Sequence, residues 1–504
     1  MRISPRTVGR AAWAVILILT ITMITAQWHA WEPLVPTVAR TVWTSVVAAV
    51  VAASVGGLLA FAHRIAGTFA WIVALTACLP LVIPSAALAT ALVHEPFGMD
   101  PYGPAIVVAA HALSYLPVAF VLQAVALASV TDEILLVSAS LGAGPFQTAG
   151  RVLRGPWARS FAMSVAVAAL FIASDPSVTL VYGGTDSYIA SHLLRGMSTG
   201  LPVGPALYVL ILPTLALTLV VTTIDRGPLR EPFRGRAPEF VTSYLGGRRL
   251  VPFLVTPMLL SDAILLAIMV RGSSPGSLAD GLLVDVAGTT LAVVVLVIPA
   301  ALVGGFVTTF LARRGPILRI IIGALLTITF LLSQSVIGMM LSAAFRDSTE
   351  IGSVTVLPAL VGGGALAGGY LAVGLAYLSA ALPIAHAGMM IMVRDLGDLV
   401  DAARDAGSDR IRAGFVLAPV LAPRMAAVMA IMSGIILTRT APVIFVQPPG
   451  FETASTSLTA LAAAGWDDRV FALSLVTALA ATLLFVAAAA VLKSVPARTG
   501  ERND

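Results

Sequence analysis

Apolar runs as long as a bilayer is thick recur through the whole chain. An α-helix needs about 20 apolar residues to cross a ~30 Å hydrocarbon layer. Backbone groups in lipid must bond within their own segment, so each run is expected to be a helix. The runs are 11–27, 35–62, 69–93, 103–129, 158–182, 202–224, 250–270, 282–311, 317–345, 354–380, 424–446 and 469–492. The sequence therefore predicts an all-α polytopic membrane protein with about 12 transmembrane helices.

Charge supports this count. Only 11% of the residues are charged, against about 25% in soluble domains. With the N-terminus inside, all but six of the 30 Lys and Arg residues fall in inner loops, as the positive-inside rule requires. The exceptions are Arg40, Arg195, Arg271, Arg346, Arg439 and Arg469. We therefore expect a multi-pass protein of the plasma (cytoplasmic, inner) membrane with both termini in the cytoplasm.

The arginines of the inner loops flank lipid. They therefore imply the bilayer as a partner and do not imply nucleic acid. Cys78 is the one cysteine, which leaves no disulfide within the chain. The basic start and the apolar run up to Gln27 also resemble a signal peptide. Cleavage there would spoil the alternation of charge, so we favour a retained first helix.

The chain divides into two similar halves. A linker rich in Arg, Pro and Gly, 226–249, separates 1–225 from 250–504, with six runs in each part. When Gly142 is set against Gly407, Pro117 and Pro383 lie 25 and 24 residues before the glycine, and Arg159 and Arg424 lie 17 residues after it. Equal numbers of spans in equal orientation predict two parallel six-helix repeats. The alternative is a chance coincidence of Pro and Gly positions.

A polar segment between two spans occurs in each half, at 131–157 and 394–423. The second contains acidic residues at helical spacing, then a glycine that permits a sharp turn into another short helix. Such an element is too small to fold alone, so we expect it to dock on a cytoplasmic partner. Its candidate residues are Asp401, Ala402, Ala403, Gly407 and Arg410, with Gly142, Ala143 and Gly144 in the first segment.

The second segment resembles the EAA loop of permease subunits of type I binding-protein-dependent ABC importers. Asp401 takes the acidic position, Ala402 and Ala403 take the alanine positions, and Gly407 takes the glycine. The first segment is a degenerate copy, because Leu136 stands where the acid is usual. Single-chain fusion of two halves is similar to permeases for iron(III), thiamine and aminoethylphosphonate.

This resemblance implies two coupling loops, one on each of two ABC ATPase subunits, and an extracytoplasmic solute-binding protein on the other side of the membrane. ATP and Mg²⁺ would bind the ATPase partners, and the chain itself would need no cofactor. It is not expected to be an enzyme, because a phosphate-binding loop requires Gly-Lys-Ser/Thr and the one lysine, Lys493, follows Leu492.

Charged groups inside spans cost about 2.5–3.5 kcal/mol, so each calls for a partner or a role. Asp175 and Arg439 lie at equivalent positions, 33 and 32 residues after the two glycines. We hypothesise that they face each other across the solute pathway, or bind solute; the alternative is that each reaches interfacial water. Tyr115 and His111 are weaker pathway candidates. No cluster has the spacing of metal ligands.

The main alternative from another class is a secondary transporter driven by an ion gradient. It predicts membrane-embedded carboxylates for proton or sodium coupling, and Asp175 and Asp262 are such groups. This alternative leaves the segment 394–423 without a purpose. A membrane enzyme lacks any reactive constellation in the sequence.

Overall fold

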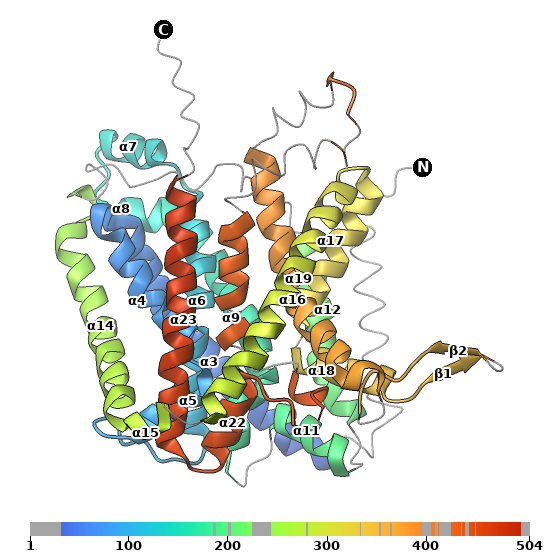
Figure 1. Cartoon of the computed structure of the whole chain (residues 1–504). Helices are drawn as coiled ribbons and strands as arrows, with labels where there is room; N and C mark the ends of the chain where they lie inside the picture. Colours follow the sequence, from blue (N-terminus) through green and yellow to red (C-terminus); the bar gives the residue numbers. More distant parts are fainter. Residues whose placement is uncertain are drawn as a thin grey trace. The chain divides into compact units, whose positions relative to one another are not determined.

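The computed structural model describes most of the chain (Figure 1). The described residues are 32–184, 188–199, 203–223, 243–278, 281–332, 334–351, 354–362, 365–395, 405–408, 412, 425–434, 436–438, 443–448 and 450–494. The predicted span 11–27 and most of the predicted linker 226–249 lie outside this set.

Eight helices in the described part are long and apolar enough to cross a membrane. They are α3 (Val35–Ile65), α6 (Pro104–Ala128), α9 (Arg154–Ser174), α12 (Gly204–Thr223), α14 (Gly247–Gly272), α16 (Gly281–Ala312), α19 (Tyr370–Asp395) and α23 (Asp467–Ser494). Two bent pairs raise the number to ten if each pair is one span. These pairs are α4 (Ala70–Val82) with α5 (Ser85–Val93), and α17 (Pro316–Leu331) with α18 (Gln334–Phe345). The protein is therefore a helical membrane protein, as predicted in outline.

Shorter elements join these helices. They are α7 (Asp132–Ser140), α8 (Pro145–Thr148), a π-helical turn (Ala149–Leu153), α10 (Pro176–Tyr182), α11 (Ile189–Thr199), α15 (Pro275–Leu278), α22 (Ala454–Ala463) and the 3₁₀ turns Glu32–Leu34, Gly67–Phe69, Leu366–Gly369 and Val443–Phe445. The strands β1 (Thr349–Ile351) and β2 (Val354–Leu357) pair antiparallel.

Three predicted spans differ from the structure. The run 354–380 opens with β2, and α19 begins only at Tyr370, because β-branched residues favour the strand and a glycine-rich stretch follows it. The run 158–182 breaks at Asp175, before Pro176, since proline removes a backbone donor inside a helix. For the run 424–446, the structure describes a shorter apolar helix, Met425–Thr438.

The chain divides into two compact units. Unit 1 comprises Met1–Ala279, Leu331–Val336 and Leu458–Leu475, and unit 2 comprises Asp280–Phe330, Ile337–Ser457 and Val476–Asp504. In unit 1, α3, α6 and α9 pack on one another, and α14 packs on α3, α4 and α5. In unit 2, the main packing is of α16 on α19.

A close helix crossing at a glycine occurs in each unit. In unit 1, a Cβ added at Gly56 of α3 would lie 2.8 Å from the backbone nitrogen of Phe120 in α6. In unit 2, a Cβ added at Gly305 of α16 would lie 2.7 Å from Cβ of Ala385 and 2.9 Å from the backbone nitrogen of His386 in α19. Both crossings therefore require a residue without a side chain, so that the two backbones can approach.

A threonine also caps a short helix in each unit. The backbone N–H of Ile189, where α11 begins, donates to Oγ1 of Thr41 in α3 at 3.0 Å. The backbone N–H of Ala454, where α22 begins, donates to Oγ1 of Thr290 in α16 at 2.9 Å. The threonines are 249 residues apart in sequence, as are Gly56 and Gly305. The helix starts are 265 residues apart, as are Gly142 and Gly407.

Candidate functional site

The predicted first loop forms a helix–turn–helix at one end of unit 1, with α5 and α15 at the opposite end (Figure 1). The helix α7 ends in a left-handed turn, where Gly142 has φ of +80°. The N–H of Gly142 donates to the carbonyl of Ala139 at 2.9 Å, and the N–H of Ala143 donates to the carbonyl of Ser138 at 3.2 Å. Gly144 then precedes α8 as its N-cap residue. Glycine accepts this positive φ without strain, so the chain can turn sharply at Gly142.

The outer surface of this loop carries several large apolar side chains. Only Leu135 of α7 is buried, whereas Leu141 is 81% and Phe146 is 88% exposed. The exposed apolar residues, here called the α7–α8 patch, are Ile134, Leu136, Val137, Leu141 and Phe146. A patch of large apolar side chains on a polar loop marks a surface that another protein or a membrane covers.

Two anchors hold the loop on the helices behind it. At its start, the guanidinium of Arg64 in α3 pairs with the carboxylate of Asp132 and donates to the carbonyl of Val130 at 3.0 Å. At its turn, the hydroxyl of Tyr244 donates to the carbonyl of Ala143. That bond uses the one hydroxyl proton of Tyr244, which lies near the end of the predicted linker 226–249, in the part that the structure describes.

A short relay of hydroxyls completes the second anchor. Thr148 Oγ1 lies 2.9 Å from the Tyr244 hydroxyl oxygen and 2.9 Å from Ser138 Oγ. Because the proton of Tyr244 is already donated, Thr148 donates to Tyr244 and accepts from Ser138. One tyrosine therefore fixes both α7 and α8 through side-chain bonds.

Replacing Tyr244 with Phe should loosen this loop without unfolding the protein. The change removes two hydrogen bonds, each worth about 1 kcal/mol, so local opening should become about five- to thirtyfold more frequent. Hydrogen exchange of the segment 141–153, followed by mass spectrometry, measures this directly. Tyr208→Phe in α12 is the matched control, and equal exchange in both variants would show that Tyr244 does not hold the loop.

The predicted second loop is described in only a few places. Asp401, Ala402, Ala403 and Arg410 lie outside the described residues. Gly407 is exposed with φ of +85°, close to the value at Gly142. A side chain at either glycine would meet nothing within 4 Å. Both glycines therefore serve the backbone conformation and not a packing contact.

Asp175 lies at the break between α9 and α10, and its carboxylate is engaged within unit 1. Its Oδ1 accepts from the backbone N–H of Ser177 at 3.0 Å and from the hydroxyl of Ser177. The Asp175 side chain thereby caps the N-terminus of α10. Oδ2 accepts from the hydroxyl of Tyr115 in α6 at 3.0 Å. Asp175 is buried, with 7% of its surface exposed. Its expected partner Arg439 lies outside the described residues.

Other polar groups surround this break. Ser177 Oγ is 2.6 Å from Ser85 Oγ, in the first turn of α5. Ser335, in the first turn of α18, donates its hydroxyl to the carbonyl of Ser174 at 2.6 Å. Three short helices therefore begin beside Asp175, and its negative charge complements their N-terminal dipoles. Of the weaker candidates, Tyr115 thus belongs to this cluster, and His111 is fully buried with its ring 6.3 Å from that of Tyr115.

Replacing Asp175 with Ala should destabilise unit 1, whereas Asn should retain most of the stability. Loss of a cap costs about 1 kcal/mol, and loss of the hydrogen bond from Tyr115 costs about 1 kcal/mol more. Asn offers one acceptor to Ser177 and one polar group to Tyr115. Thermal unfolding of the two variants in detergent distinguishes them. Equal midpoints would mean that the carboxylate serves something other than this junction.

Sequence reasoning missed Arg64, Tyr244, Ser85 and Ser177. Arg64, Tyr244 and Ser85 act through partners distant in sequence, which spacing alone does not reveal, and Ser177 bonds both its neighbour Asp175 and the distant Ser85. Among the described residues, no group of three or more His, Cys, Asp or Glu side chains is placed to hold a metal ion. Comparisons with protein-family models, with curated proteins and with solved structures find no match.

Proposed function

We propose that this protein is the permease component of an ATP-driven importer, of the ABC type I class. The observation that carries the proposal is the α7–α8 patch. It is an apolar docking surface on a loop that the charge distribution assigns to the cytoplasm, and Arg64 and Tyr244 hold it in place. A braced loop transmits force, whereas an unbraced one would yield when a partner moved.

The recurring contacts support the finer architecture. The glycine crossings at Gly56 and Gly305, and the helix caps at Thr41 and Thr290, are the features expected of two parallel six-helix repeats. Ten candidate spans, the predicted run 11–27 and the shorter helix Met425–Thr438 together account for the proposed 12 helices. The halves proposed from sequence remain 1–225 and 250–504.

In the proposed mechanism, each half presents its loop to one of two ATPase subunits in the cytoplasm. ATP binding brings these subunits together, and the loops transmit the movement to the spans, so that the pathway opens alternately to each side. A solute-binding protein delivers the solute from outside. This assignment places the chain in the plasma membrane with both termini in the cytoplasm, and places ATP and Mg²⁺ on the partner subunits.

The solute class rests on sequence resemblance alone. Iron(III), thiamine and phosphonates are candidates because fused permeases of this kind carry them. Arg439 favours an anionic solute or an anionic complex. The Asp175 carboxylate is occupied by Ser177 and Tyr115, which favours a structural role for that side chain over direct contact with the solute.

A second candidate is an ion-driven carrier, and Asp262 is the observation that favours it. This residue of α14 is 2% exposed, and its Oδ2 has no hydrogen-bond partner among the described residues. Buried carboxyl groups of this kind serve as proton or sodium sites in carriers. An ion-driven carrier would give Asp262 a role but would give the α7–α8 patch none. We therefore place this function second.

Co-purification tests the two candidates against each other. The tagged chain is isolated from its native membrane beside a variant that carries Gly407→Pro and Asp401→Arg, and bound protein is identified and assayed for ATP hydrolysis. The importer predicts an ATPase that the variant loses. Transport without an ATPase, unaffected by the variant but abolished by Asp262→Asn, would establish the carrier.

A further inference from the structure

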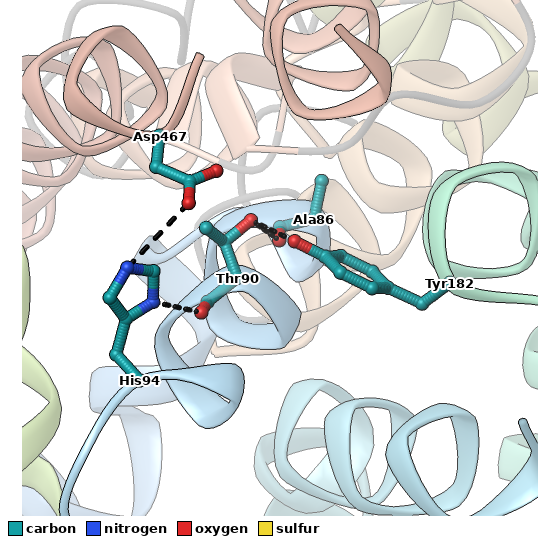
Figure 2. Close-up of polar contacts among 5 residues, drawn as sticks. All are labelled: Ala86, Thr90, His94, Tyr182 and Asp467. Carbon is teal, nitrogen blue, oxygen red and sulfur yellow. Dashed lines mark hydrogen bonds and ion pairs between the residues drawn. The ribbon is translucent and has the colours of Figure 1, made fainter. Parts of the chain in front are cut away.

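The end of α5 is held rigidly at the side of unit 1 opposite the α7–α8 patch. The hydroxyl of Thr90 donates to the carbonyl of Ala86 at 3.0 Å, and the hydroxyl of Tyr182 in α10 lies 2.6 Å from Thr90 Oγ1 (Figure 2). After α5 ends, the N–H groups of Phe97 and Gly98 both donate to the carbonyl of His94, at 3.1 and 3.0 Å. The backbone of His94 is therefore fixed on both sides.

The imidazole of His94 has one defined proton. Its Nδ1 lies 2.9 Å from the carbonyl oxygen of Thr90, and a carbonyl only accepts, so Nδ1 must donate. The ring packs edge-to-face on Phe471 with centroids 5.4 Å apart. Phe471 is fully buried, and its ring leaves no room for a Cβ at Gly272, which would lie 2.5 Å from Cδ2. The ring of His94 thus has a set orientation.

This orientation points Nε2 at a carboxylate. Nε2 lies 3.6 Å from Oδ2 of Asp467, the first residue of α23, as Figure 2 shows. In the neutral ring with Nδ1 protonated, Nε2 carries a lone pair, which an ionised carboxylate repels. Only the doubly protonated ring attracts Asp467. The interaction between His94 and Asp467 is therefore attractive when Nε2 is protonated and repulsive when it is not.

The neighbouring charged residues do not replace His94 as the ion-pair partner of Asp467. Asp468 accepts from the Ser277 hydroxyl at 2.5 Å, which holds α23 on α15. The guanidinium of Arg469 lies over the Trp466 ring, 4.6 Å from its centroid. The other titratable or charged side chains nearest to this contact along the elements packed here are Glu95, Asp100 and Tyr102 after α5, Tyr182 at the end of α10 and Arg271 near the end of α14. Within the described part of the chain, Asp467 pairs with His94.

We propose that His94 and Asp467 form a proton-dependent latch between the end of α5 and the start of α23. Protonation of His94 closes the latch, and loss of the proton opens it. The side chains are 40% and 42% exposed, so water and protons reach both. Histidine is the side chain whose charge ordinarily changes between pH 5 and 8. An ion pair this exposed should change the closed-to-open ratio by about two- to fivefold.

The latch does not depend on what the protein transports, but it has a consequence for the proposed importer. It lies on the side predicted to face outward, where a solute-binding protein would dock. It also ties a helix of the first proposed half to a helix of the second. Opening of the pathway toward the outside would then be easier at neutral than at acidic pH.

Distance measurement in the full-length protein tests the latch without any transport assay. Spin labels are placed on Asp100→Cys and Ala464→Cys, both exposed positions, in a Cys78→Ala background reconstituted in lipid nanodiscs. Double electron–electron resonance is recorded at about pH 5 and pH 8. We expect the shorter, narrower distance population to be about two- to fivefold larger at the lower pH.

Two variants and a control decide the result. His94→Gln and Asp467→Asn should each remove the pH dependence, whereas His192→Gln in α11 should keep it. The latch is overturned if the distances do not change with pH, or if the change persists in both His94→Gln and Asp467→Asn. Because no ATPase or solute is involved, failure here would leave the proposed function untouched.

Discussion

Exchanging Leu141 and Phe146 together for aspartate should abolish binding of an ATPase subunit while leaving the protein in the membrane. Both side chains are more than four-fifths exposed in the described structure, so their loss removes no internal packing. Buried apolar anchors at the centre of an interface contribute about 2 kcal/mol or more each. Two such losses should lower the amount of co-purified ATPase at least about tenfold.

The control is Tyr102→Asp, an exposed aromatic residue, 67% accessible, on the opposite side of unit 1. It should leave ATPase recovery unchanged. Quantitative mass spectrometry of the purified complexes, normalised to the permease, provides the measurement. Equal recovery from the double variant and the wild type would remove the α7–α8 patch from the proposal.

Valine at Gly56 or at Gly305 should prevent accumulation of folded protein. At both crossings even a methyl group would lie under 3.0 Å from the backbone of the facing helix, and a helix backbone cannot move aside as a side chain can. Overpacking in a core costs about 1–3 kcal/mol, and occasionally more. We expect a cost of about 3 kcal/mol or more for valine, because its β-branched side chain adds further atoms at the same crossing.

Gly288→Val in α16 and Gly323→Val in α17 are matched controls, since a Cβ at either position meets nothing within 4 Å. Size-exclusion chromatography of fluorescently tagged variants reports the folded, monodisperse fraction. Losses at both crossings with intact controls would support equivalent roles in a repeat. A severe loss at one crossing and a neutral result at the other would argue against that equivalence.

The positions and lengths of the apolar runs in the sequence predicted most of the spanning helices well. The runs 35–62, 103–129, 250–270 and 282–311 agree within three residues at each end with α3, α6, α14 and α16. Membrane helices are set by a local requirement, namely that backbone groups bond within the segment, so local sequence is enough.

The prediction failed where other constraints were stronger. The run 354–380 is apolar throughout, but the chain pairs Val354–Leu357 with Thr349–Ile351 before α19 begins. Mean hydropathy does not distinguish a β-branched strand from a helix. The run 158–182 breaks at Asp175, before Pro176; the proline is visible in the sequence, but the hydrogen bonds of Asp175 to Tyr115 and Ser177 are not.

The same contrast applies to the candidate site. Gly142 and Gly407 were identified because positive φ is a local demand that glycine meets. Tyr244 and Arg64 act through residues 101 and 68 positions away, respectively. Such pairs depend on how helices pack, and nothing in their own neighbourhood marks them. The α7–α8 patch also escaped notice, because an apolar residue in an apolar chain carries no signal until its exposure is known.

Site-specific photo-cross-linking tests docking of the α7–α8 patch most directly. A photoreactive amino acid replaces Phe146, 88% exposed on the patch, or Phe253, 76% exposed on α14 in a predicted span. Cells are irradiated, and the tagged permease is purified under denaturing conditions. The account predicts a covalent adduct with an ATP-binding protein at position 146 and none at position 253. Adducts with lipid alone at both positions would contradict it.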